Sequence, residues 1–382
     1  MKTALIHDYI KEYGGAERVL EALHGIWPDA TVFTLVYLPK FLGPHKERFK
    51  DWKIKTSFLQ YLPFKEKLIS PFRLIAPFVF KTFDLSNYDI VIISATGAYS
   101  PNMVSVKPTS QNLKFAQRPV HICYCHTPPR YLYGYATARD WKKNLIFRAI
   151  GEIGNHFLRL VDFKNAQNVD YFIANSKNVA GRIKKFYRRE STVIYPPVGT
   201  ALGLVKNFSH AKAPRADSYF LAGGRLARAK HIDLIIQACQ ELNLPLKIFG
   251  RAFGGYDQEV ENQNSKVDFL GEVTDENKLE LMRNARAFIF AAEDEDFGIT
   301  PVEAMSVGTP VIAYKSGGVV ESVINGKTGI FFDELTVDSL RKAVEQLSNV
   351  TINPADCIRQ AKKFSKENFK KEIKEFVERV LR

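Results

Sequence analysis

Two glutamates that flank the start of an expected helix have the spacing that most directly suggests chemistry in this chain. The stretch 293–310 reads EDEDFGITPVEAMSVGTP, in which seven residues separate Glu295 from Glu303. The pattern predicts an acidic turn, a helix that opens at Thr300-Pro301, and then a short apolar strand. Carboxylates accept hydrogen bonds from hydroxyl groups, and amides at a helix N-terminus attract phosphate. The segment therefore suits a ligand that carries sugar hydroxyls and phosphates together.

Glu303 also has a structural interpretation. With Thr300 as N-cap and Pro301 as the first helical residue, Glu303 falls at the third helical position, as in a capping box. The two interpretations are compatible, because a helix N-terminus is itself an anion site. The backbone amides expected to face phosphate there belong to Phe297, Gly298 and Ile299.

A glycine-rich basic segment upstream favours the ligand-binding interpretation. Residues 218–230 read SYFLAGGRLARAK, so that an apolar strand ends at Gly223-Gly224, with Arg225 and Lys230 after it. Glycine lets a backbone approach a ligand closely, and Arg and Lys side chains suit a diphosphate. Taken alone, the two cations are also typical of a solvated basic loop. In combination with the glutamate pair they favour a diphosphate site, with Gly224 close to the ligand.

Together these segments resemble the donor site of family 4 retaining glycosyltransferases, which have the GT-B fold. The segment GGAER at 14–18 is similar to the acceptor-side glycine loop of that family. Residues 121–133, HICYCHTPPRYLY, together with the opening ALIHDY, resemble the WbaZ-type O-antigen mannosyltransferases. The resemblance covers nearly the whole chain in order. It implies transfer of mannose from GDP-mannose to a glycan or a polyprenyl-diphosphate-linked oligosaccharide in surface polysaccharide synthesis.

The resemblance implies roles for the second-half residues. Arg225 and Lys230 would neutralise the diphosphate as charge builds on the leaving group. Glu303 would bind the ribose hydroxyls, and Glu295 those of the donor sugar. The family is retaining and has no agreed enzymic nucleophile. We therefore expect front-face transfer, in which the leaving phosphate takes the acceptor proton and Glu295 is not a nucleophile.

The first half supplies further candidates through the same resemblance. His126 follows an expected strand at 120–125, where the family often places a histidine that faces the sugar, so we expect it to contact the donor sugar and assist catalysis. The alternative is a histidine satisfied within the core or capping the Thr-Pro-Pro that follows. Arg130 and Tyr131 are candidates for the acceptor side. Gly14 and Gly15 would let the backbone approach the donor phosphate and the acceptor.

Two other short motifs have alternative interpretations. His7-Asp8 ends the first expected strand and either borders the site or forms a turn. Asp294-Glu295-Asp296 spells D-x-D, the metal motif of GT-A glycosyltransferases, and acidic pairs do recruit Mg²⁺ or Mn²⁺. Since Arg225 and Lys230 already provide positive charge, and the GT-B class is metal-independent, we expect no metal and no cofactor.

Strand–helix alternation runs through both halves of the chain. Short apolar segments rich in Ile and Val alternate with amphipathic stretches, which predicts two doubly wound parallel sheets. The expected architecture is α/β, a GT-B fold of two Rossmann-like domains facing a central cleft. The expected divisions are an acceptor-side domain 1–200, a linker 201–217, a nucleotide-sugar domain 218–360 and a C-terminal helix 361–382 that packs back on the first domain.

Charge is concentrated in the first half. The net charge is +13, and residues 1–200 hold 29 Lys and Arg against 15 Asp and Glu. This asymmetry indicates an anionic partner. No nucleic-acid-binding motif is found, so a nucleic acid is not expected. The segment 58–83, FLQYLPFKEKLISPFRLIAPFVFKTF, mixes bulky apolar residues with four cations, and its three prolines exclude one spanning helix.

The segment 58–83 is typical of an interfacial segment on an anionic membrane, and the alternative is an acceptor-pocket lid. The four cysteines lack metal spacing, and no signal peptide or transmembrane run is recognised. We therefore expect a cytoplasmic protein attached peripherally to the inner face of the cytoplasmic membrane.

Three competing functions follow from other interpretations. The first is a family 4 enzyme that uses a UDP-sugar; the residues expected at the base pocket, 250–255 and 270–273, do not discriminate the bases. The second is a non-catalytic sugar-nucleotide-binding protein, which is disfavoured because both halves of the chain retain candidate site residues. The third is an NAD-dependent oxidoreductase, which is disfavoured because no G-x-G-x-x-G follows the opening strand.

Overall fold

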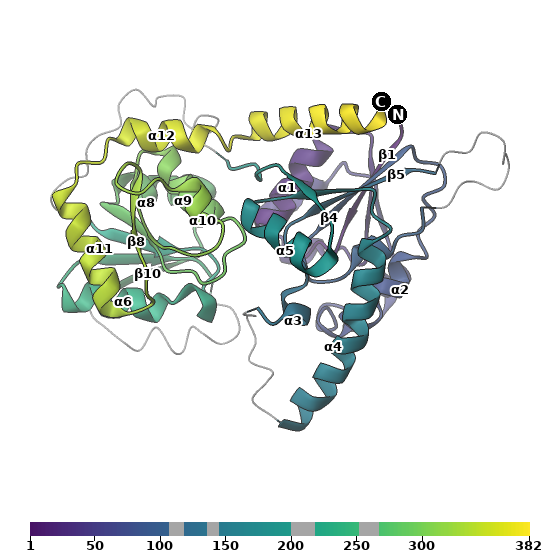
Figure 1. Cartoon of the computed structure of the whole chain (residues 1–382), viewed down its shortest axis with the longest axis horizontal. Helices are drawn as coiled ribbons and strands as arrows, with labels where there is room; N and C mark the ends of the chain where they lie inside the picture. Colours follow the sequence, from purple (N-terminus) through teal and green to yellow (C-terminus); the bar gives the residue numbers. More distant parts are fainter. Residues whose placement is uncertain (107–117, 136–144, 200–217, 252–266) are drawn as a thin grey trace. The chain divides into compact units, whose positions relative to one another are not determined.

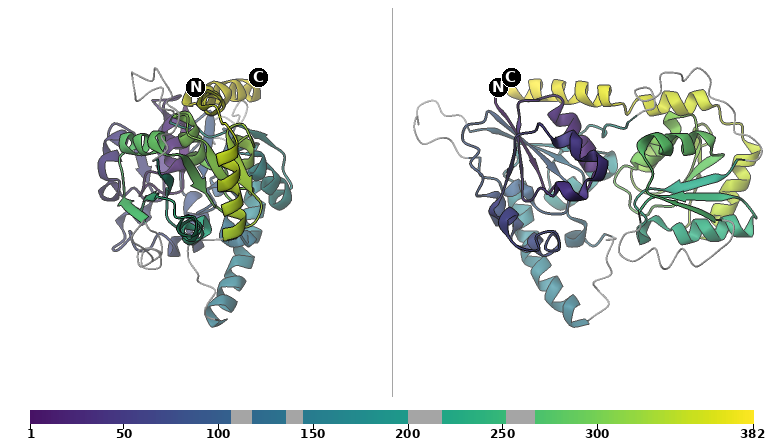
Figure 2. Two further views of the ribbon diagram at one scale, coloured as in Figure 1. Left: turned by 90° about the vertical axis from the view of Figure 1, so that its left-hand side faces the viewer. Right: turned by 180° about the vertical axis from the view of Figure 1, so that it is seen from behind.

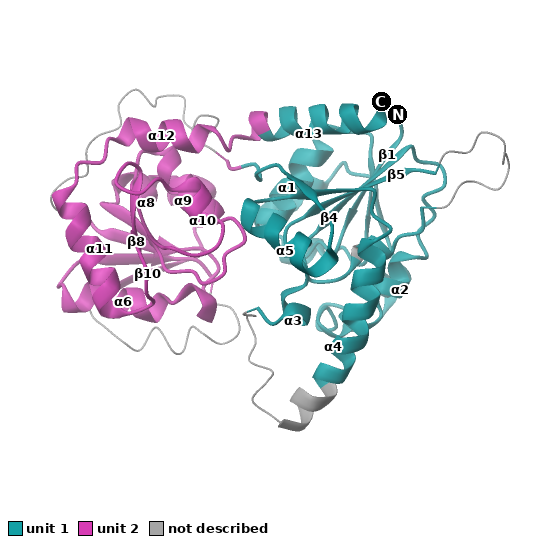
Figure 3. Ribbon diagram, viewed as in Figure 1, with its two compact units in different colours: residues 1–135, 141–197, 369–382 teal, residues 136–140, 198–368 magenta. Residues whose placement is uncertain are grey.

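The chain folds into two compact units, which are described separately (Figure 1, Figure 3). The computed structural model describes residues 1–106, 118–135, 145–199, 218–251 and 267–382. The first unit takes its described residues from Met1–Tyr135, Trp141–Pro197 and Phe369–Arg382, and the second from Val198–Asn368. The expected linker 201–217 lies outside the described residues, as does most of the expected base-pocket segment 250–255.

A parallel sheet of order β3-β2-β1-β4-β5-β6-β7 forms the centre of the first unit. Its strands are β1 Thr3–His7, β2 Thr31–Thr34, β3 Ile54–Thr56, β4 Ile90–Ala95, β5 Val120–Cys125, β6 Tyr171–Ala174 and β7 Ser191–Val193. Every residue of β1 and β4 is buried, as expected for parallel strands covered by helices on both faces. The order reverses between β1 and β4, so ligands are expected at the carboxyl ends of these two strands.

The sequence predicts strands at 3–7, 90–94, 120–125, 171–174 and 192–195. The strands β1, β4, β5, β6 and β7 lie within two residues of these ranges, whereas β2 and β3 were not predicted. The reason is that β2 and β3 have only four and three residues. The strand β3 also reads IKT and is incompletely buried, so it lacks the apolar run on which the prediction depends.

The helices of the first unit are α1 Gly15–His24, α2 Ala76–Phe80, α3 Arg130–Tyr133, α4 Leu145–Ala166 and α5 Lys177–Tyr187. Short 3-10 turns lie at Pro39–Phe41, Gly43–Phe49, Phe58–Tyr61 (η3), Pro71–Leu74 (η4) and Pro101–Met103 (η5). The helix α5 has the bounds that the sequence predicts, 177–187. For α4 the sequence predicts a helix at 141–165, of which residues 141–144 lie outside the described residues.

The segment 58–83 is folded into short turns rather than one helix. It contains η3, η4 and α2, and prolines occupy the first turns of η4 and α2. Phe72 and Phe80 are buried in the core of the first unit, whereas Phe58, Phe64 and Phe78 are exposed. Among the described residues, no helix has both the length and the apolar character needed to cross a bilayer.

The second unit contains a six-stranded parallel sheet of order β10-β9-β8-β11-β12-β13. Its strands are β8 Phe220–Gly223, β9 Leu246–Phe249, β10 Val267–Gly271, β11 Ala287–Phe290, β12 Val311–Tyr314 and β13 Gly329–Phe332. All lie within one residue of the ranges that the sequence predicts, which are 219–222, 246–249, 267–270, 287–291, 311–313 and 329–332. Helices cover both faces of this sheet (Figure 2). The order reverses between β8 and β11, which places the expected ligand position at their carboxyl ends.

The helices of the second unit are α6 Ile232–Glu241, α8 Asp275–Asn284, α9 Ile299–Ser306, α10 Val319–Ser322, α11 Val337–Asn349 and α12 Pro354–Lys362, with a 3-10 turn at Arg228–Lys230. Asn353 caps α12, since its side chain accepts a hydrogen bond from the amide of Ala355. The final helix α13, Lys366–Leu381, follows an interruption of the helix after Lys362. Its residues from Phe369 onward belong to the first unit, where Phe369 and Phe376 join the core.

Candidate functional site

In the second unit, the two predicted motifs meet at the switch point of the sheet. The loop after β8 carries Arg225 and Lys230, and the acidic turn 293–296 follows the neighbouring strand β11. The two loops are joined because the amide of Glu293 donates to the carbonyl of Ala229 at 2.9 Å. Arg225 is exposed on this loop. The structure therefore brings together at one sheet edge groups that stand about 70 residues apart in the chain.

Lys230 and Glu295 are in direct contact. The Nζ of Lys230 donates a hydrogen bond to Oε2 of Glu295, and the two side chains are 24% and 25% exposed. The same Nζ lies 4.7 Å from the centre of the Phe290 ring at the end of β11, which adds a cation–π contact. The ammonium group is thus held in one place at the mouth of the site, beside a carboxylate. An arriving diphosphate would find a positioned cation there.

The N-terminus of α9 lies beside the glycine loop. Gly224 has a φ of +116°, which glycine adopts readily, and a Cβ built on it would lie 3.6 Å from Oγ1 of Thr300 in the first turn of α9. The N-cap is Gly298, with φ +85°, and within the described residues no side chain caps this helix. Its first-turn amides are therefore not engaged by a side-chain cap, as a phosphate site requires.

The capping-box interpretation of Glu303 is wrong. The helix α9 begins at Ile299, so Thr300 is inside the helix and Glu303 lies beyond the position that a capping box requires. The carboxylate is buried, and its Oε1 instead accepts a hydrogen bond from Nζ of Lys278 at 2.8 Å. Lys278, on α8, also donates to Asp275 at 3.0 Å. Glu303 is therefore oriented by its ion pair with Lys278 of the neighbouring helix α8, and not by capping its own helix.

Sequence reasoning did not predict the roles of Lys278 or of Gly317-Gly318. The amide of Gly318 donates to the carbonyl of Glu295 at 2.8 Å. A Cβ on Gly317 would lie 2.2 Å from that carbonyl oxygen, so only glycine fits against the acidic turn. The signal available in the sequence was a glycine pair just after the end of an expected strand. The side chain of Phe297 also helps to fix the turn, because it is buried and packs on Phe364 with ring centres 5.3 Å apart.

In the first unit, a second group of polar side chains gathers at the switch point of the sheet. The register pairs His7 at the end of β1 with Ser94 near the end of β4, and His126 directly follows β5. The Oγ of Ser94 lies 3.2 Å from Nδ1 of His7 and 2.9 Å from Nε2 of His126. All three residues are at least nine-tenths buried. Ser94 was not predicted, because a serine inside an apolar strand carries no distinctive sequence signal.

His126 is a neutral histidine in this environment. Burial lowers the pKa of its imidazole to about 3, and the nearby His7 contributes in the same direction. Its amide donates to the carbonyl of Ala95 at 2.9 Å, and its own carbonyl accepts from Nδ2 of Asn175 at 2.9 Å. A neutral imidazole suits hydrogen bonding to a hydroxyl group better than binding of an anion. The alternative of a histidine satisfied in the core is compatible with part of this geometry, through the Ser94 contact.

Asp8 is not a local turn residue. Its Oδ2 accepts hydrogen bonds from the amide of Thr96, at 3.1 Å, and from the hydroxyl of the same residue, which follows β4. Burial is the largest influence on the carboxyl group and raises its pKa, although the hydrogen bonds from Thr96 oppose this. Asp8 therefore links the ends of two adjacent strands beneath the first-unit site.

The predicted glycine loop is engaged within the protein. Gly14 is the N-cap of α1, and its amide donates to Oε2 of Glu17 at 2.8 Å in a capping box. Gly15 is the first helical residue, one position before Ala16, where the sequence predicts that the helix begins. Because Glu17 already accepts the Gly14 amide, close approach of a ligand at this loop would involve other groups than that N–H.

Arg130 and Tyr131 lie together in the short helix α3. The Tyr131 ring has the guanidinium of Arg73 over it, 4.4 Å from its centre, so the segment 58–83 contacts the expected acceptor side. Burial raises the pKa of the Tyr131 hydroxyl. Next to it, the hydroxyl of Tyr133 donates to the buried Asp162 at 2.9 Å. The structure thus places both predicted acceptor-side residues within the first unit.

The D-x-D segment adopts a tight turn in the second unit. Asp294 has a φ of +52°, and the backbone after it is held by Gly318. Within the described part of the chain, no group of three or more His, Cys, Asp or Glu side chains is arranged to hold a metal ion.

Comparison with known proteins finds a similarity to one family model and to several enzymes. Residues 206–364 match the model of the family "Glycosyl transferases group 1". The human alpha-1,3/1,6-mannosyltransferase ALG2 is 26% identical over 291 residues, which cover 68% of this chain and 67% of that protein. The ALG2 protein of Rhizomucor pusillus is 24% identical over 328 residues, which cover 73% of this chain and 67% of that protein.

Solved structures share the fold over nearly the whole chain. Sucrose-phosphate synthase from Thermosynechococcus elongatus has a TM-score of 0.70 at 18% identity, covering 100% of this chain and 99% of its own. Anabaena Alr3699/HepE, solved in complex with UDP and glucose, has a TM-score of 0.66 at 18% identity, covering 99% of this chain and 100% of its own. The predicted α/β GT-B fold, with two Rossmann-like parallel-sheet domains, is therefore confirmed.

Proposed function

We propose, from the relation of this chain to the group 1 glycosyltransferases with the GT-B fold, that it transfers a hexose from a nucleotide-sugar. The donor is GDP-mannose, and the acceptor is a glycan or a polyprenyl-diphosphate-linked oligosaccharide of surface polysaccharide synthesis. The observation that carries the proposal is the contact between Lys230 and Glu295 beside the N-terminus of α9. Two cations, a helix terminus and two carboxylates at one sheet edge match the charges and hydroxyls of such a donor.

Each of these residues is assigned to a different part of the donor. Arg225 and Lys230 neutralise the diphosphate, with help from the first-turn amides of α9. Glu303, oriented by Lys278, accepts hydrogen bonds from the ribose hydroxyls. Glu295 binds hydroxyls of the sugar ring. Since Lys230 contacts Glu295, a bound diphosphate would share or take over that ammonium group.

Transfer proceeds on the front face, with retention of configuration. The bond from C1 of the sugar to the diphosphate oxygen breaks as the bond from C1 to the acceptor oxygen forms on the same face. The proton of the acceptor hydroxyl passes to the departing diphosphate oxygen. The positioned cations favour this step because they stabilise the charge that grows on the leaving group. His126 contributes as a neutral hydrogen-bonding contact to the sugar.

Mannose is supported by the printed names of the ALG2 relatives, which are mannosyltransferases. A UDP-sugar is the second candidate donor, because Alr3699/HepE was solved with UDP and glucose. A non-catalytic nucleotide-sugar-binding protein would bind either donor without releasing nucleotide.

We expect the protein to release GDP from GDP-mannose in EDTA, because its cations replace the metal ion. The measurement is nucleotide release from GDP-mannose, UDP-glucose and UDP-N-acetylglucosamine, with a polyprenyl-diphosphate oligosaccharide as acceptor. Preference for a UDP-sugar would replace the donor assignment, and binding without release would support the non-catalytic alternative. Activity that is lost in EDTA and restored by Mn²⁺ would assign Asp294 and Asp296 as metal ligands and overturn metal independence.

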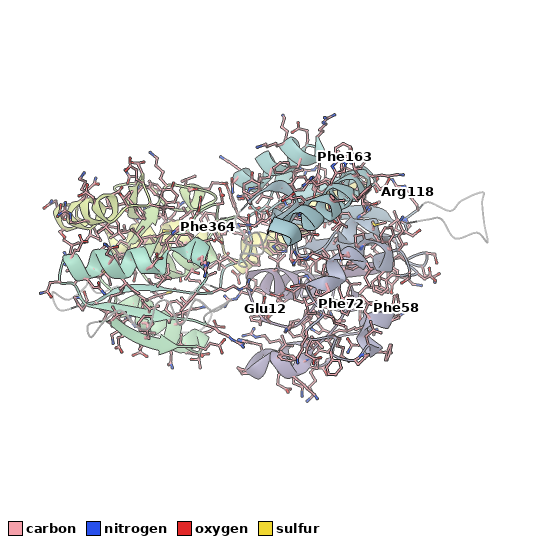
Figure 4. All side chains as sticks on the ribbon, turned by 90° about the horizontal axis from the view of Figure 1, so that it is seen from below. Glu12, Phe58, Phe72, Arg118, Phe163 and Phe364 are labelled. Atoms are coloured by element: carbon pink, nitrogen blue, oxygen red, sulfur yellow. The ribbon has the colours of Figure 1, made fainter. Side chains whose placement is uncertain are left out.

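The first unit is proposed to dock peripherally on an anionic membrane, at the cytoplasmic face. Phe58 is 57% exposed, whereas Phe72 of the same segment is buried; both are labelled in Figure 4. Phe64 is 68% exposed. The helix α4 of the same unit also exposes an apolar stripe, formed by Ile153, Phe157 and Leu160. Exposed apolar side chains among lysines and arginines are typical of interfacial binding. The interior packing of Phe72 and Phe80 supports the alternative of an acceptor lid.

We expect Phe58→Ser/Phe64→Ser to weaken binding to anionic vesicles at least about tenfold, since each phenylalanine would bury apolar surface in the bilayer. The measurement is sedimentation with phosphatidylglycerol-containing and neutral phosphatidylcholine vesicles, at low and high salt. Val320→Ser, which removes an exposed apolar residue of the second unit, is the matched control. Salt-insensitive binding to both lipids would exclude the electrostatic part, and no binding to either would leave the lid alternative.

A further inference from the structure

A chain of four buried polar side chains runs across the carboxyl ends of three adjacent strands in the first unit. Oε1 of Glu17 lies 3.5 Å from Nε2 of His7, and Nδ1 of His7 lies 3.2 Å from Oγ of Ser94. Ser94 in turn lies 2.9 Å from Nε2 of His126. Glu17 is 6% exposed, His126 is 9% exposed, and the two central residues are fully buried.

The positions of the protons follow from one end of this chain. The Glu17 carboxylate is an acceptor, so Nε2 of His7 is its donor. In a neutral imidazole the other nitrogen is then an acceptor, so Nδ1 of His7 accepts a hydrogen bond from the hydroxyl of Ser94. The only proton of the Ser94 hydroxyl is engaged in that hydrogen bond, so its oxygen accepts a hydrogen bond from Nε2 of His126. His126 therefore carries its proton on Nε2, and Nδ1 is left as an acceptor.

We infer that Glu17, His7 and Ser94 are positioning residues that fix His126 in the Nε2–H tautomer. The consequence for the site rests on the proposed function: an acceptor Nδ1 receives a hydrogen bond from a hydroxyl of the bound sugar. No proton needs to move along the chain, because its role is to hold one tautomer of one imidazole. Second partners of this kind commonly fix which nitrogen of a histidine carries the proton.

The charged groups around His7 matter because a doubly protonated His7 would reverse the direction of these hydrogen bonds. The carboxyl groups near it belong to Glu17 and Asp8, and His126 is the other imidazole within its reach. If His7 carried two protons, its Nδ1 would donate to Ser94, Ser94 would donate to Nε2 of His126, and His126 would carry its proton on Nδ1. The two arrangements predict opposite tautomers for the same residue.

The test is a ¹⁵N–¹H correlation spectrum of the full-length protein without donor, labelled at the histidine ring nitrogens. His126→Gln assigns the signals of His126, and the exposed His156 provides a tautomer-averaged reference. We expect an N–H-type shift for Nε2 and an unprotonated shift for Nδ1, unchanged from pH 8 to about 5, since the low pKa keeps this ring neutral. An Nδ1–H pattern in the wild-type protein would overturn the inference.

Ser94→Ala provides the second half of the test. We expect it to shift the His126 signals toward tautomer averaging and to lower kcat about fivefold, as for loss of one hydrogen bond. Ser94→Thr retains the hydroxyl and should restore both. If Ser94→Ala does not fold, His7→Phe removes the acceptor for Ser94 and should also release the tautomer. Unchanged His126 signals in the folded variant would contradict the inference, while failure of transfer activity alone would count against the proposed function.

Discussion

Replacement of Lys230 by alanine is expected to lower kcat/KM at least about 100-fold. This is the scale for loss of one group that stabilises charge on a leaving group. The ammonium is held between Glu295 and the Phe290 ring, so it is already positioned when a ligand arrives. The substitution also removes the ammonium group beside Glu295, so a diphosphate would meet that carboxylate without the positive charge of Lys230. The measurement is steady-state transfer from GDP-mannose.

Lys247 offers a closely matched control in the same unit. Its Nζ is paired with Asp268 at 3.4 Å and lies 4.7 Å from the Tyr219 ring, but on strand β9, away from the acidic turn. Lys247→Ala should change kcat/KM less than about threefold, because exposed ion pairs contribute little. Wild-type turnover in Lys230→Ala, or equal losses in both variants, would remove the role proposed for Lys230.

Replacement of Lys278 by methionine is expected to lower the free energy of unfolding of the second unit by about 3 kcal/mol. Removal of one member of a buried ion pair is strongly destabilising, because the remaining charge loses a close opposite charge where little water can reach it. Lys278 is 12% exposed and Glu303 is 5% exposed, so water can replace little of the lost contact. Nucleotide affinity should fall as well, since Glu303 would lose the cation that orients it.

Hydrogen exchange at the α9 amides measures this unit separately from the first, which one global unfolding curve would not do. Lys342→Met is the control, because Lys342 is 70% exposed and pairs with Asp338 on the surface of α11, where an ion pair contributes little to stability. The double variant Lys278→Met/Glu303→Gln should recover part of the stability. A Lys278→Met protein as stable as the control would show that Glu303 is not held as described.

The elements that form the site were largely predictable from the sequence. Runs of buried apolar residues identify parallel strands, and the glycines and charges that follow β8 and β11 indicate the loops at the switch point. The start of α9 was mispredicted because Thr300-Pro301 is a strong capping signal, whereas the chain uses the left-handed conformation of Gly298 instead. The geometry of the preceding turn therefore determines where α9 begins, and the local capping preference of Thr300-Pro301 does not.

The partners of the site residues were not predictable. Lys278 reaches Glu303 from another helix, and Ser94 reaches two histidines across three strands. Such contacts depend on register and side-chain direction, which a single sequence does not specify. The same holds for Gly317-Gly318, whose requirement for glycine comes from a backbone contact with a turn more than 20 residues away.

A crystal structure of the protein with bound GDP would test the donor site most directly. We expect the diphosphate to contact Lys230, Arg225 and the first-turn amides of α9, the ribose hydroxyls to donate to Glu303, and Lys278 to keep its contact with that carboxylate. A diphosphate bound away from Lys230, or bridged by a metal ion to Asp294 and Asp296, would contradict the proposed donor site.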